Sequence, residues 1–212
     1  MLSGILGGNK TVRKIKGDGS KTLKNQSERT LNTGNLKLVV QKPETDSLNE
    51  WLALNTVQFY NVTNFLYGAL IEYCNDKTCK TMTAGKWEYH WKDGKKKAQK
   101  LPAHLYIKEL MEWIESLVND STVFPEDPGE DGKNFPKDFP KTVKKIFTRL
   151  FRVYAHIYYS HFEQVQQFNF ERHLNTSLQH FILFSQEFNI VDKKDLVPLE
   201  AKVKSLIESV PI

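Results

Sequence analysis

Two cysteines and a distant pair of histidines constrain the fold of this 212-residue chain more than any other feature. The only cysteines, Cys74 and Cys79, form a C-x4-C pair, and His156 and His161 form an H-x4-H pair much later in the chain. Each spacing falls in the range of structural zinc sites, where four nitrogen and sulfur ligands surround the ion. The stretch between the pairs is far longer than in a compact zinc finger. A metal here would therefore join two distant segments of one domain.

Helix geometry and several alternatives weigh against this metal site. Five residues of α-helix turn the chain by about 500°, so His156 and His161 would point about 140° apart unless the helix is distorted. His173 and His180 lie on one helical face and compete as the histidine pair. Two free buried cysteines are common, and a disulfide is a further alternative, though unusual inside cells. Spacing alone leaves these alternatives open.

Most of the chain follows the apolar period of amphipathic helices. A long helix is expected to begin at Ser47, because Ser47 and Glu50 have the spacing of a capping box and apolar residues then recur at steps of three and four. Four further helices are expected at about 102–118, 141–162, 175–188 and 198–209. The pattern predicts a mostly α-helical bundle.

Two segments interrupt the helical pattern. Residues 86–91 alternate, with Trp87, Tyr89 and Trp91 on one face, and Asp93-Gly94 follows. Asp-Gly favours a tight turn, which predicts a small β-hairpin with a lysine-rich return strand at 95–100. The proline-rich segment 124–140 cannot continue a helix and is expected to be a surface loop anchored by phenylalanines.

The basic charge of the chain belongs to its N-terminal segment. Residues 1–42 carry nine basic and two acidic side chains, while the remaining residues carry 21 basic and 23 acidic ones. We therefore expect a flexible basic arm at 1–25 and a folded domain at 26–212. No apolar run is long enough for a membrane span, and the first residues do not form a signal peptide, so we expect a soluble intracellular protein without membrane insertion.

Two functions other than protein binding are suggested by the zinc-like spacing. A nucleic-acid-binding zinc module would use the lysines of 92–100 beside Trp87, Tyr89 and Trp91, but the net charge of −2 after residue 42 argues against it. A zinc hydrolase needs an open coordination position, which two cysteines and two histidines would fill. The sequence also contains no HExxH or G-x-S-x-G motif.

Several sequence strings, in a fixed order, resemble one known family. They are Leu48-Asn49-Glu50-Trp51, Glu88-Tyr89-His90-Trp91, Leu150-Phe151-Arg152-Val153-Tyr154 followed by Ala155-His156-Ile157-Tyr158, His173-Leu174-Asn175-Thr176 and Gln186-Glu187-Phe188-Asn189. From about Thr30 to the C-terminus the chain is similar to the Mob family (Mps-one-binder proteins). It resembles the core kinase co-activator branch more than the phocein-type branch.

The resemblance implies a mostly helical, non-enzymatic adaptor with a structural zinc ion. Its ligands would be Cys74, Cys79, His156 and His161. Proteins of this family bind the basic N-terminal regulatory region of NDR/LATS-type Ser/Thr kinases and promote their activity in Hippo-like and mitotic-exit signalling. They also bind phosphorylated segments of an upstream Ste20-type kinase or scaffold. We accordingly expect a cytoplasmic protein, with the nucleus and spindle poles as further locations.

The surface expected to bind a basic kinase segment is acidic. The resemblance and the charge pattern indicate Asp46 and Glu50 as kinase contacts, with Trp51 either a contact or buried. Glu50 is also expected to cap the long helix, because carboxylates are favoured at helix N-termini. Gln58 stands where the family often has an acidic residue, which weakens this acidic surface.

The surface expected to bind phosphate is basic. Lys145, Arg149 and Arg152 form one stripe at i, i+4 and i+7. The family's phosphothreonine pocket matches Arg149 and Arg152, while Thr148 replaces a basic residue and Lys145 could supply the missing charge. The resemblance also implies phosphorylation sites in the N-terminal region, with Thr30 well matched and Thr11 weakly matched.

Overall fold

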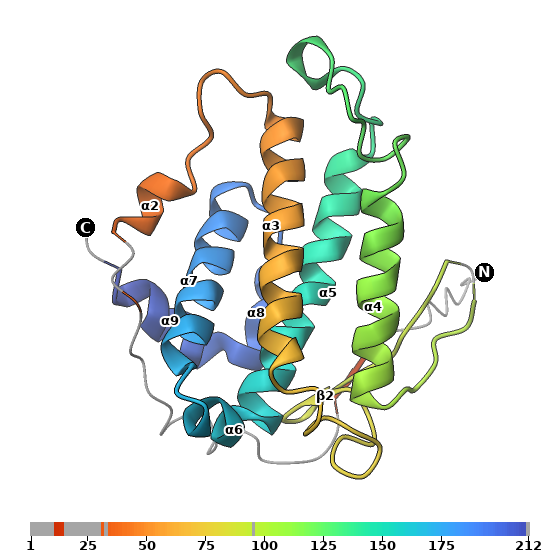
Figure 1. Ribbon diagram of the computed structural model, residues 1–212, viewed down its shortest axis with the longest axis vertical. Helices are drawn as coiled ribbons and strands as arrows, with labels where there is room; N and C mark the ends of the chain where they lie inside the picture. The colour runs from red at the N-terminus through yellow and green to blue at the C-terminus, as the bar shows by residue number, and fades with distance from the viewer. Residues whose placement is uncertain (1–10, 15–30, 32–33, 95, 211–212) are drawn as a thin grey trace, which may run out of the picture.

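The computed structural model describes residues 11–14, 31, 34–94 and 96–210. Four long helices form its body: α3 (Leu48–Gly68), α4 (Ala103–Val118), α5 (Phe139–Ser160) and α7 (Glu171–Glu187). In Figure 1, α3 and α5 run in one direction, and α4 and α7 run in the opposite direction. This confirms the predicted helical bundle.

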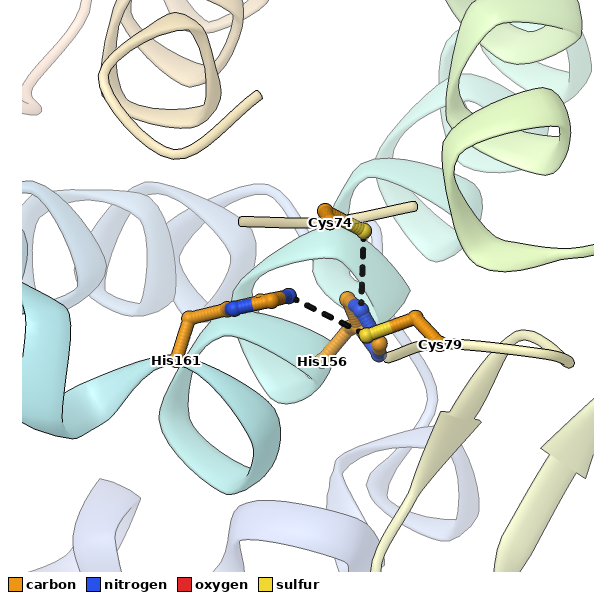
Figure 2. A group of neighbouring side chains, drawn as sticks. All are labelled: Cys74, Cys79, His156 and His161. Carbon is orange, nitrogen blue, oxygen red and sulfur yellow. Dashed lines mark hydrogen bonds between the residues drawn. The ribbon is translucent and has the colours of Figure 1, made fainter. Parts of the chain in front are cut away.

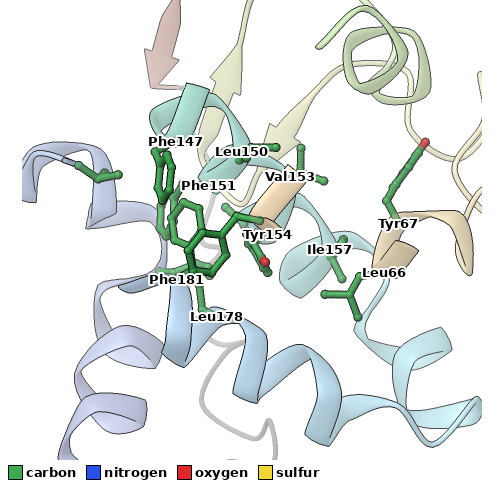
Figure 3. Close-up of a cluster of buried hydrophobic side chains, with 14 of the residues drawn as sticks. Leu66, Tyr67, Phe147, Leu150, Phe151, Val153, Tyr154, Ile157, Leu178 and Phe181 are labelled. Carbon is green, nitrogen blue, oxygen red and sulfur yellow. The ribbon is translucent and has the colours of Figure 1, made fainter. Parts of the chain in front are cut away.

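The helix α5 lies at the centre of the bundle. Every residue from 151 to 158 is buried, as expected for a helix covered on all sides. Its Phe147 ring stacks on Phe181 of α7 at 5.0 Å between centroids, and Phe59 of α3 meets Phe147 edge-on at 5.4 Å. Figure 3 shows Phe147, Phe151, Tyr154 and Phe181 in this cluster. These aromatic contacts hold α3, α5 and α7 together.

The N-terminus of α3 has the predicted capping box. The Ser47 hydroxyl accepts a hydrogen bond from the Glu50 N–H at 3.3 Å, and the Glu50 carboxylate accepts one from the Ser47 N–H at 2.9 Å. The loop before α5 packs against this cap at Gly132, whose φ is +71°. A Cβ at Gly132 would collide with the Ser47 hydroxyl, so this contact requires glycine.

Several short helices complete the chain. They are α2 (Leu36–Val39), α6 (Phe162–Gln167), α8 (Lys193–Leu196), α9 (Glu200–Glu208) and the 3-10 helices η1 (Glu130–Gly132) and η2 (Val197–Leu199). The predicted helix at 141–162 is α5, which begins two residues earlier, with Pro140 in its first turn. It ends at Ser160, because His161 is not helical and Phe162 begins the separate helix α6. The predicted helix at 175–188 is α7, which begins at Glu171.

A three-stranded antiparallel sheet lies at the end of the bundle where α3 finishes and α4 begins (Figure 1). The predicted strand is present as β3 (Trp87–Tyr89), but its partners differ from those expected. It pairs with β2 (Thr83–Ala84), through a turn in which Gly85 has a φ of +54°, and with β1 (Val12–Lys14). In the described part of the expected return strand, only Gln99 forms a bridge, to Trp91.

The strand β1 corrects one expectation about the N-terminal arm. Residues 12–14 were assigned to a flexible segment, yet they pair in register with β3, and Val12 packs against the core. The short strand needs this tertiary partner, which local sequence does not reveal. Of the predicted arm at 1–25, residues 1–10 and 15–25 lie outside the described residues.

The proline-rich loop is anchored as predicted. Phe124 and Phe135 contact Phe139 at centroid distances of 5.0 and 4.5 Å, and Phe139 is fully buried. The loop therefore covers one end of the bundle with its aromatic side chains. Of the helices in the described part of the chain, none has both the length and the apolar character to cross a bilayer.

Candidate metal centre and binding surfaces

The two cysteines and two histidines converge in one buried cluster (Figure 2). All four ligand atoms lie within 4.8 Å of one another. Cys74 Sγ lies 3.5 Å from His156 Nε2, and Cys79 Sγ lies 3.4 Å from His161 Nε2. Tetrahedral zinc, with bonds of about 2.3 Å to sulfur and about 2.0 Å to nitrogen, separates sulfur and nitrogen ligands by about 3.5 Å. The four residues are therefore positioned to bind a metal ion.

A break in the helix brings the two histidines together. His156 lies within α5, but His161 follows its last residue, with φ −135° and ψ 14°, and α6 begins at the next residue. The two imidazole centroids are 5.1 Å apart. The non-helical backbone at His161 removes the divergence of about 140° that a continuous helix would impose.

The cysteines come from the turn that follows α3. The N–H of Cys79 donates to the carbonyl of Asn75 at 2.8 Å, and the Asn75 side chain accepts from the N–H of Lys77 at 3.0 Å. The turn thereby folds back on itself between the two thiols. It points both sulfur atoms toward α5, as Figure 2 shows.

The sheet orients one of the histidine ligands. The Nδ1–H of His156 donates to the carbonyl of Thr83 at 2.7 Å. With its proton on Nδ1, the imidazole keeps the lone pair of Nε2 for a metal, as partners outside the ligand shell commonly ensure. The strand β2 therefore helps to orient one ligand of the candidate metal centre.

The thiol chemistry also fits a metal. The hydrogen bond between the two thiols lowers the pKa of Cys79 and raises that of Cys74, and the imidazoles of His156 and His161 lower the pKa of Cys79 further. Both cysteines are free and buried, so the disulfide alternative does not describe this structure. A thiolate and a neutral imidazole are the forms that bind zinc, so two cysteines beside two histidines are a suitable ligand set.

The competing histidine pair lies elsewhere. His173 and His180 line an apolar cavity of about 370 Å³ at α2, α3 and α7, together with Leu31, Leu36 and Phe65. Burial lowers the pKa of His180, whose Nε2 is buried without a hydrogen-bond partner among the described residues. Because the cysteines are in the other cluster, His173 and His180 are not their partners. We call this cavity the apolar groove.

The structure places Asp46, Glu50 and Trp51 together around the start of α3, each half-buried. Glu50 is held by the capping box, and its hydrogen bonds to Ser47 lower the pKa of its carboxyl group. The indole N–H of Trp51 donates to the carbonyl of Val40 at 3.2 Å, which gives this side chain a structural contact. Gln58 is exposed at the rim of the apolar groove.

The predicted basic stripe lines a second cavity, of about 520 Å³. Lys145, Arg149 and Arg152 are joined there by Thr148 and by further residues from the sheet region and α5. These further residues are Thr11, Lys92, Gly94, Lys141 and Lys144. We call this cavity the basic pocket. Three lysines other than Lys145 thus line the basic pocket together with Thr148.

Aromatic rings hold both arginines in place. The Arg149 guanidinium lies 4.4 Å from the centroid of Trp91 and 4.5 Å from that of Trp113, and it donates to the carbonyl of Lys92 at 2.6 Å. Arg152 lies over Tyr89 at 5.1 Å and donates to the Tyr106 hydroxyl at 2.9 Å. Each arginine is only 7% exposed. Their geometry is therefore fixed before any ligand arrives.

The two arginines of the basic pocket form no direct ion pair among the described residues, although the Asp93 carboxylate acts electrostatically on Arg149 and the Asp195 carboxylate on Arg152. Lys144 of the same pocket pairs with Asp192 at 2.7 Å. Burial lowers the pKa of Arg149, and burial together with the charge of Arg149 lowers the pKa of Lys145. Such a buried cationic cluster is stabilised when an anion binds.

Two of the three aromatic residues expected to stack on nucleic acid are buried, and the third, Trp87, is half-buried. Tyr89 is 3% exposed and Trp91 5%, because they pack under Arg152 and Arg149. Lys100 pairs with the buried Glu88 at 2.7 Å, and Lys96 with Asp93 at 3.0 Å. This segment therefore supports the basic pocket and offers few exposed rings to a base.

Sequence reasoning missed the apolar groove. Its residues come from α2, which was not predicted, and from outward-facing positions of α3 and α7, such as Phe65, which is 79% exposed. An apolar side chain on the polar face of an amphipathic pattern was the available signal. Of the predicted arm sites, Thr11 lines the basic pocket, whereas Thr30 lies outside the described residues.

Comparison with known proteins agrees with this arrangement. Residues 28–199 match the Mob1/phocein family. The chain is 50% identical over 197 residues to MOB kinase activator-like 1 homolog A of Dictyostelium discoideum, covering 91% of each chain. It is 47% identical over 213 residues to MOB kinase activator-like 1A of Arabidopsis thaliana, covering 97% of this chain and 98% of that one. The protein thus belongs to the Mob1/phocein family.

Proposed function

We propose that this protein is a non-catalytic adaptor and co-activator of Ser/Thr kinases of the NDR/LATS type, acting in Hippo-like or mitotic-exit signalling. The observation that carries the proposal is its identity of 46–50%, over most of its length, to relatives named as MOB kinase activators. The partner segment would be the basic N-terminal regulatory region of such a kinase. A zinc ion in the Cys74, Cys79, His156 and His161 cluster would serve the fold and not a reaction.

The surface proposed for the kinase combines an acidic part with an apolar part. Asp46 and Glu50 supply negative charge at the start of α3, and the apolar groove lies between α2, α3 and α7. A basic amphipathic segment could place cations near the carboxylates and apolar side chains in the groove. The exposed Phe65 and Val39 at the groove are consistent with such a partner.

The proposed role of Glu50 in kinase binding can be separated from its role as a helix cap. Glu50→Gln retains a side chain that serves in a capping box but removes the charge, whereas Glu50→Lys loses both. We expect Glu50→Gln to weaken binding of a synthetic basic kinase segment severalfold with little change in melting temperature, and Glu50→Lys to weaken it about tenfold. Calorimetry and thermal melts of the same samples measure both effects.

Two results together would show that Glu50 is a cap and not a kinase contact. Glu50→Gln would bind the kinase segment like wild type, and the weaker binding of Glu50→Lys would be accounted for by its loss of stability. Asp46→Asn is the corresponding test of the neighbouring carboxylate. Its side chain accepts a hydrogen bond from the Thr45 hydroxyl at 2.9 Å, which an asparagine oxygen can also accept.

A second proposed activity is phosphothreonine-peptide binding in the basic pocket. The observation that favours it is the pair of buried arginines, fixed by Trp91, Trp113 and Tyr89 and without a direct ion pair among the described residues. Arginine suits phosphate because its planar fork makes two parallel charge-assisted hydrogen bonds. The ligand would be a phosphorylated segment of an upstream Ste20-type kinase or of a scaffold.

The arm is proposed to regulate the kinase surface through Thr30. Its neighbour Leu31 lines the apolar groove, and the N–H of Leu31 donates to the Thr176 hydroxyl at 2.7 Å. A phosphate on Thr30 would add about −1.5 to −2 charge to a basic segment and weaken its attraction to the acidic surface.

The expected result for Thr30→Glu is tighter binding of the basic kinase segment than in wild type or in the uncharged control Thr30→Val. This substitution is a more specific test than deleting residues 1–35, because that deletion would also remove β1 and Leu31. Isothermal titration compares the three chains. Equal affinities would mean that charge at residue 30 does not control the surface.

A further inference from the structure

Tyr67 buries a hydroxyl group that lacks a hydrogen bond. It is the penultimate residue of α3, only 5% exposed, and its hydroxyl oxygen has no hydrogen-bond partner among the described residues. Figure 3 shows Tyr67 apart from the rings of Phe147 and Phe181, with its hydroxyl group directed away from them. A buried hydroxyl without a partner costs free energy, which a phenylalanine at this position would avoid. The hydroxyl group of Tyr67 therefore calls for an explanation other than packing.

The Tyr67 hydroxyl interacts with the thiol of Cys74. Backbone hydrogen bonds bring the two residues together, because the N–H of Leu70 donates to the Tyr67 carbonyl at 2.8 Å and the N–H of Cys74 donates to the Leu70 carbonyl at 3.1 Å. Cys79 and burial raise the pKa of Cys74, and the Tyr67 hydroxyl lowers it. Burial raises the pKa of Tyr67, and Cys74 raises it further. The hydroxyl thus lies where it favours the charged form of the sulfur.

The sulfur of Cys74 becomes a better hydrogen-bond acceptor when it binds a metal. A neutral thiol accepts hydrogen bonds only weakly, whereas a metal ligand is a thiolate, which carries negative charge and keeps further lone pairs. A hydrogen bond to a charged acceptor is about twice as strong as one between neutral groups. Because Cys74 is only 1% exposed, water is not a ready source of this bond. A phenol beside the sulfur can supply it.

We propose that Tyr67 is a positioning residue of the metal centre, which donates its hydroxyl hydrogen to the Cys74 thiolate when zinc is bound. The proposal rests on the zinc ion proposed above. Tyr67 would do for a sulfur ligand what the Thr83 carbonyl does for His156, which it holds at 2.7 Å. Groups outside the ligand shell commonly orient metal ligands in this way, and their loss weakens metal binding about 10–100-fold.

The first test replaces zinc by cobalt(II) in the full-length chain, because thiolate-to-cobalt charge-transfer absorption reports on the sulfur itself. A hydrogen bond lowers the energy of the sulfur lone pairs, so Tyr67→Phe should shift this band to longer wavelength. A tyrosine fluorinated beside its hydroxyl group is a stronger donor, and at position 67 it should shift the band to shorter wavelength. This chain keeps the phenol, so it decides the question even if Tyr67→Phe does not fold.

The second test measures zinc affinity by competition with a chelator. Tyr67→Phe should bind zinc about tenfold more weakly than wild type, or weaker still. The matched control is Tyr60→Phe, which removes the hydroxyl group of a half-buried tyrosine about two turns earlier in α3 and outside the metal cluster. It should leave both the cobalt band and the zinc affinity as in wild type.

A charge-transfer band that is the same in wild type, Tyr67→Phe and the fluorinated chain would overturn the proposal, even if Tyr67→Phe melts at a lower temperature. The Tyr67 hydroxyl would then affect the stability of the fold without contacting the metal-bound sulfur. If the wild-type chain binds neither zinc nor cobalt, the proposed zinc ion fails and the role of Tyr67 fails with it. Metal binding by wild type therefore distinguishes the two failures.

Discussion

Cys79→Ser is expected to lower the melting temperature by about 10 °C or more and to release one zinc ion per chain. The physical reason is that the cluster joins the turn after α3 to the end of α5, so that metal binding contributes directly to folding free energy. Loss of a structural metal costs about 4 kcal/mol or more, and for a chain of this size each kcal/mol shifts the melting temperature by about 2–4 °C. Elemental analysis and thermal melts measure the two effects.

His161→Ala should behave like Cys79→Ser, because both variants open the ligand shell. His173→Ala is the matched control, since it removes an exposed histidine that lines the apolar groove and contacts no thiol. It should retain the metal and melt within a few degrees of wild type. Freshly purified protein with no stoichiometric zinc, or a Cys79→Ser chain with unchanged metal content, would contradict a structural zinc site.

Arg149→Ala combined with Arg152→Ala is expected to weaken phosphothreonine-peptide binding by about a hundredfold or more. Each charge-assisted hydrogen bond contributes about 1.5–3 kcal/mol, and the double variant removes both guanidinium groups. Binding of the basic kinase segment should change less than twofold, because its proposed surface lies on other helices and carries the opposite charge. Fluorescence anisotropy with each peptide distinguishes the two surfaces.

Removing Arg149 also removes packing contacts, because its guanidinium contacts the rings of both Trp91 and Trp113. Thr148→Lys avoids this difficulty, since it adds a cation to the wall of the basic pocket without removing a contact there. It should bind the phosphothreonine peptide severalfold more tightly than wild type. If the double alanine variant binds normally and Thr148→Lys has no effect, the basic pocket is not the peptide site.

The sequence was sufficient for the features that local chemistry determines. The capping box at Ser47 and Glu50 involves four consecutive residues, and the helical periods of α3 and α5 repeat over five turns or more, so tertiary context had little to change. The four metal ligands were identified partly from spacing and partly from the family resemblance. Spacing alone left them open, because the helix break at His161 has no local signal such as proline or glycine.

The features that the sequence did not predict depend on distant partners. Three residues, Val12–Lys14, form a strand only because the edge of β3 is available to them. The predicted hairpin contains the correct strand, β3, but pairs it with the wrong segment. Asp93-Gly94 favours a turn, yet the chain after this turn forms only a single bridge, between Gln99 and Trp91. The apolar groove depends on the packing of α2 against α7, which no period in either segment reveals.

One helix, α5, carries Arg149 and Arg152 of the basic pocket and His156 of the metal cluster, and ends one residue before His161. These positions are related by rotation about a single axis, so one residue inserted between Arg152 and His156 would turn the two sites by about 100° relative to each other. If α5 rotated to restore the positions of the arginines, it would displace His156, and the reverse also holds. Insertions and deletions should therefore be tolerated in the loop between α4 and α5 but excluded from residues 149–161. Within that interval, the length of the chain is as much a part of the functional site as the identity of its side chains.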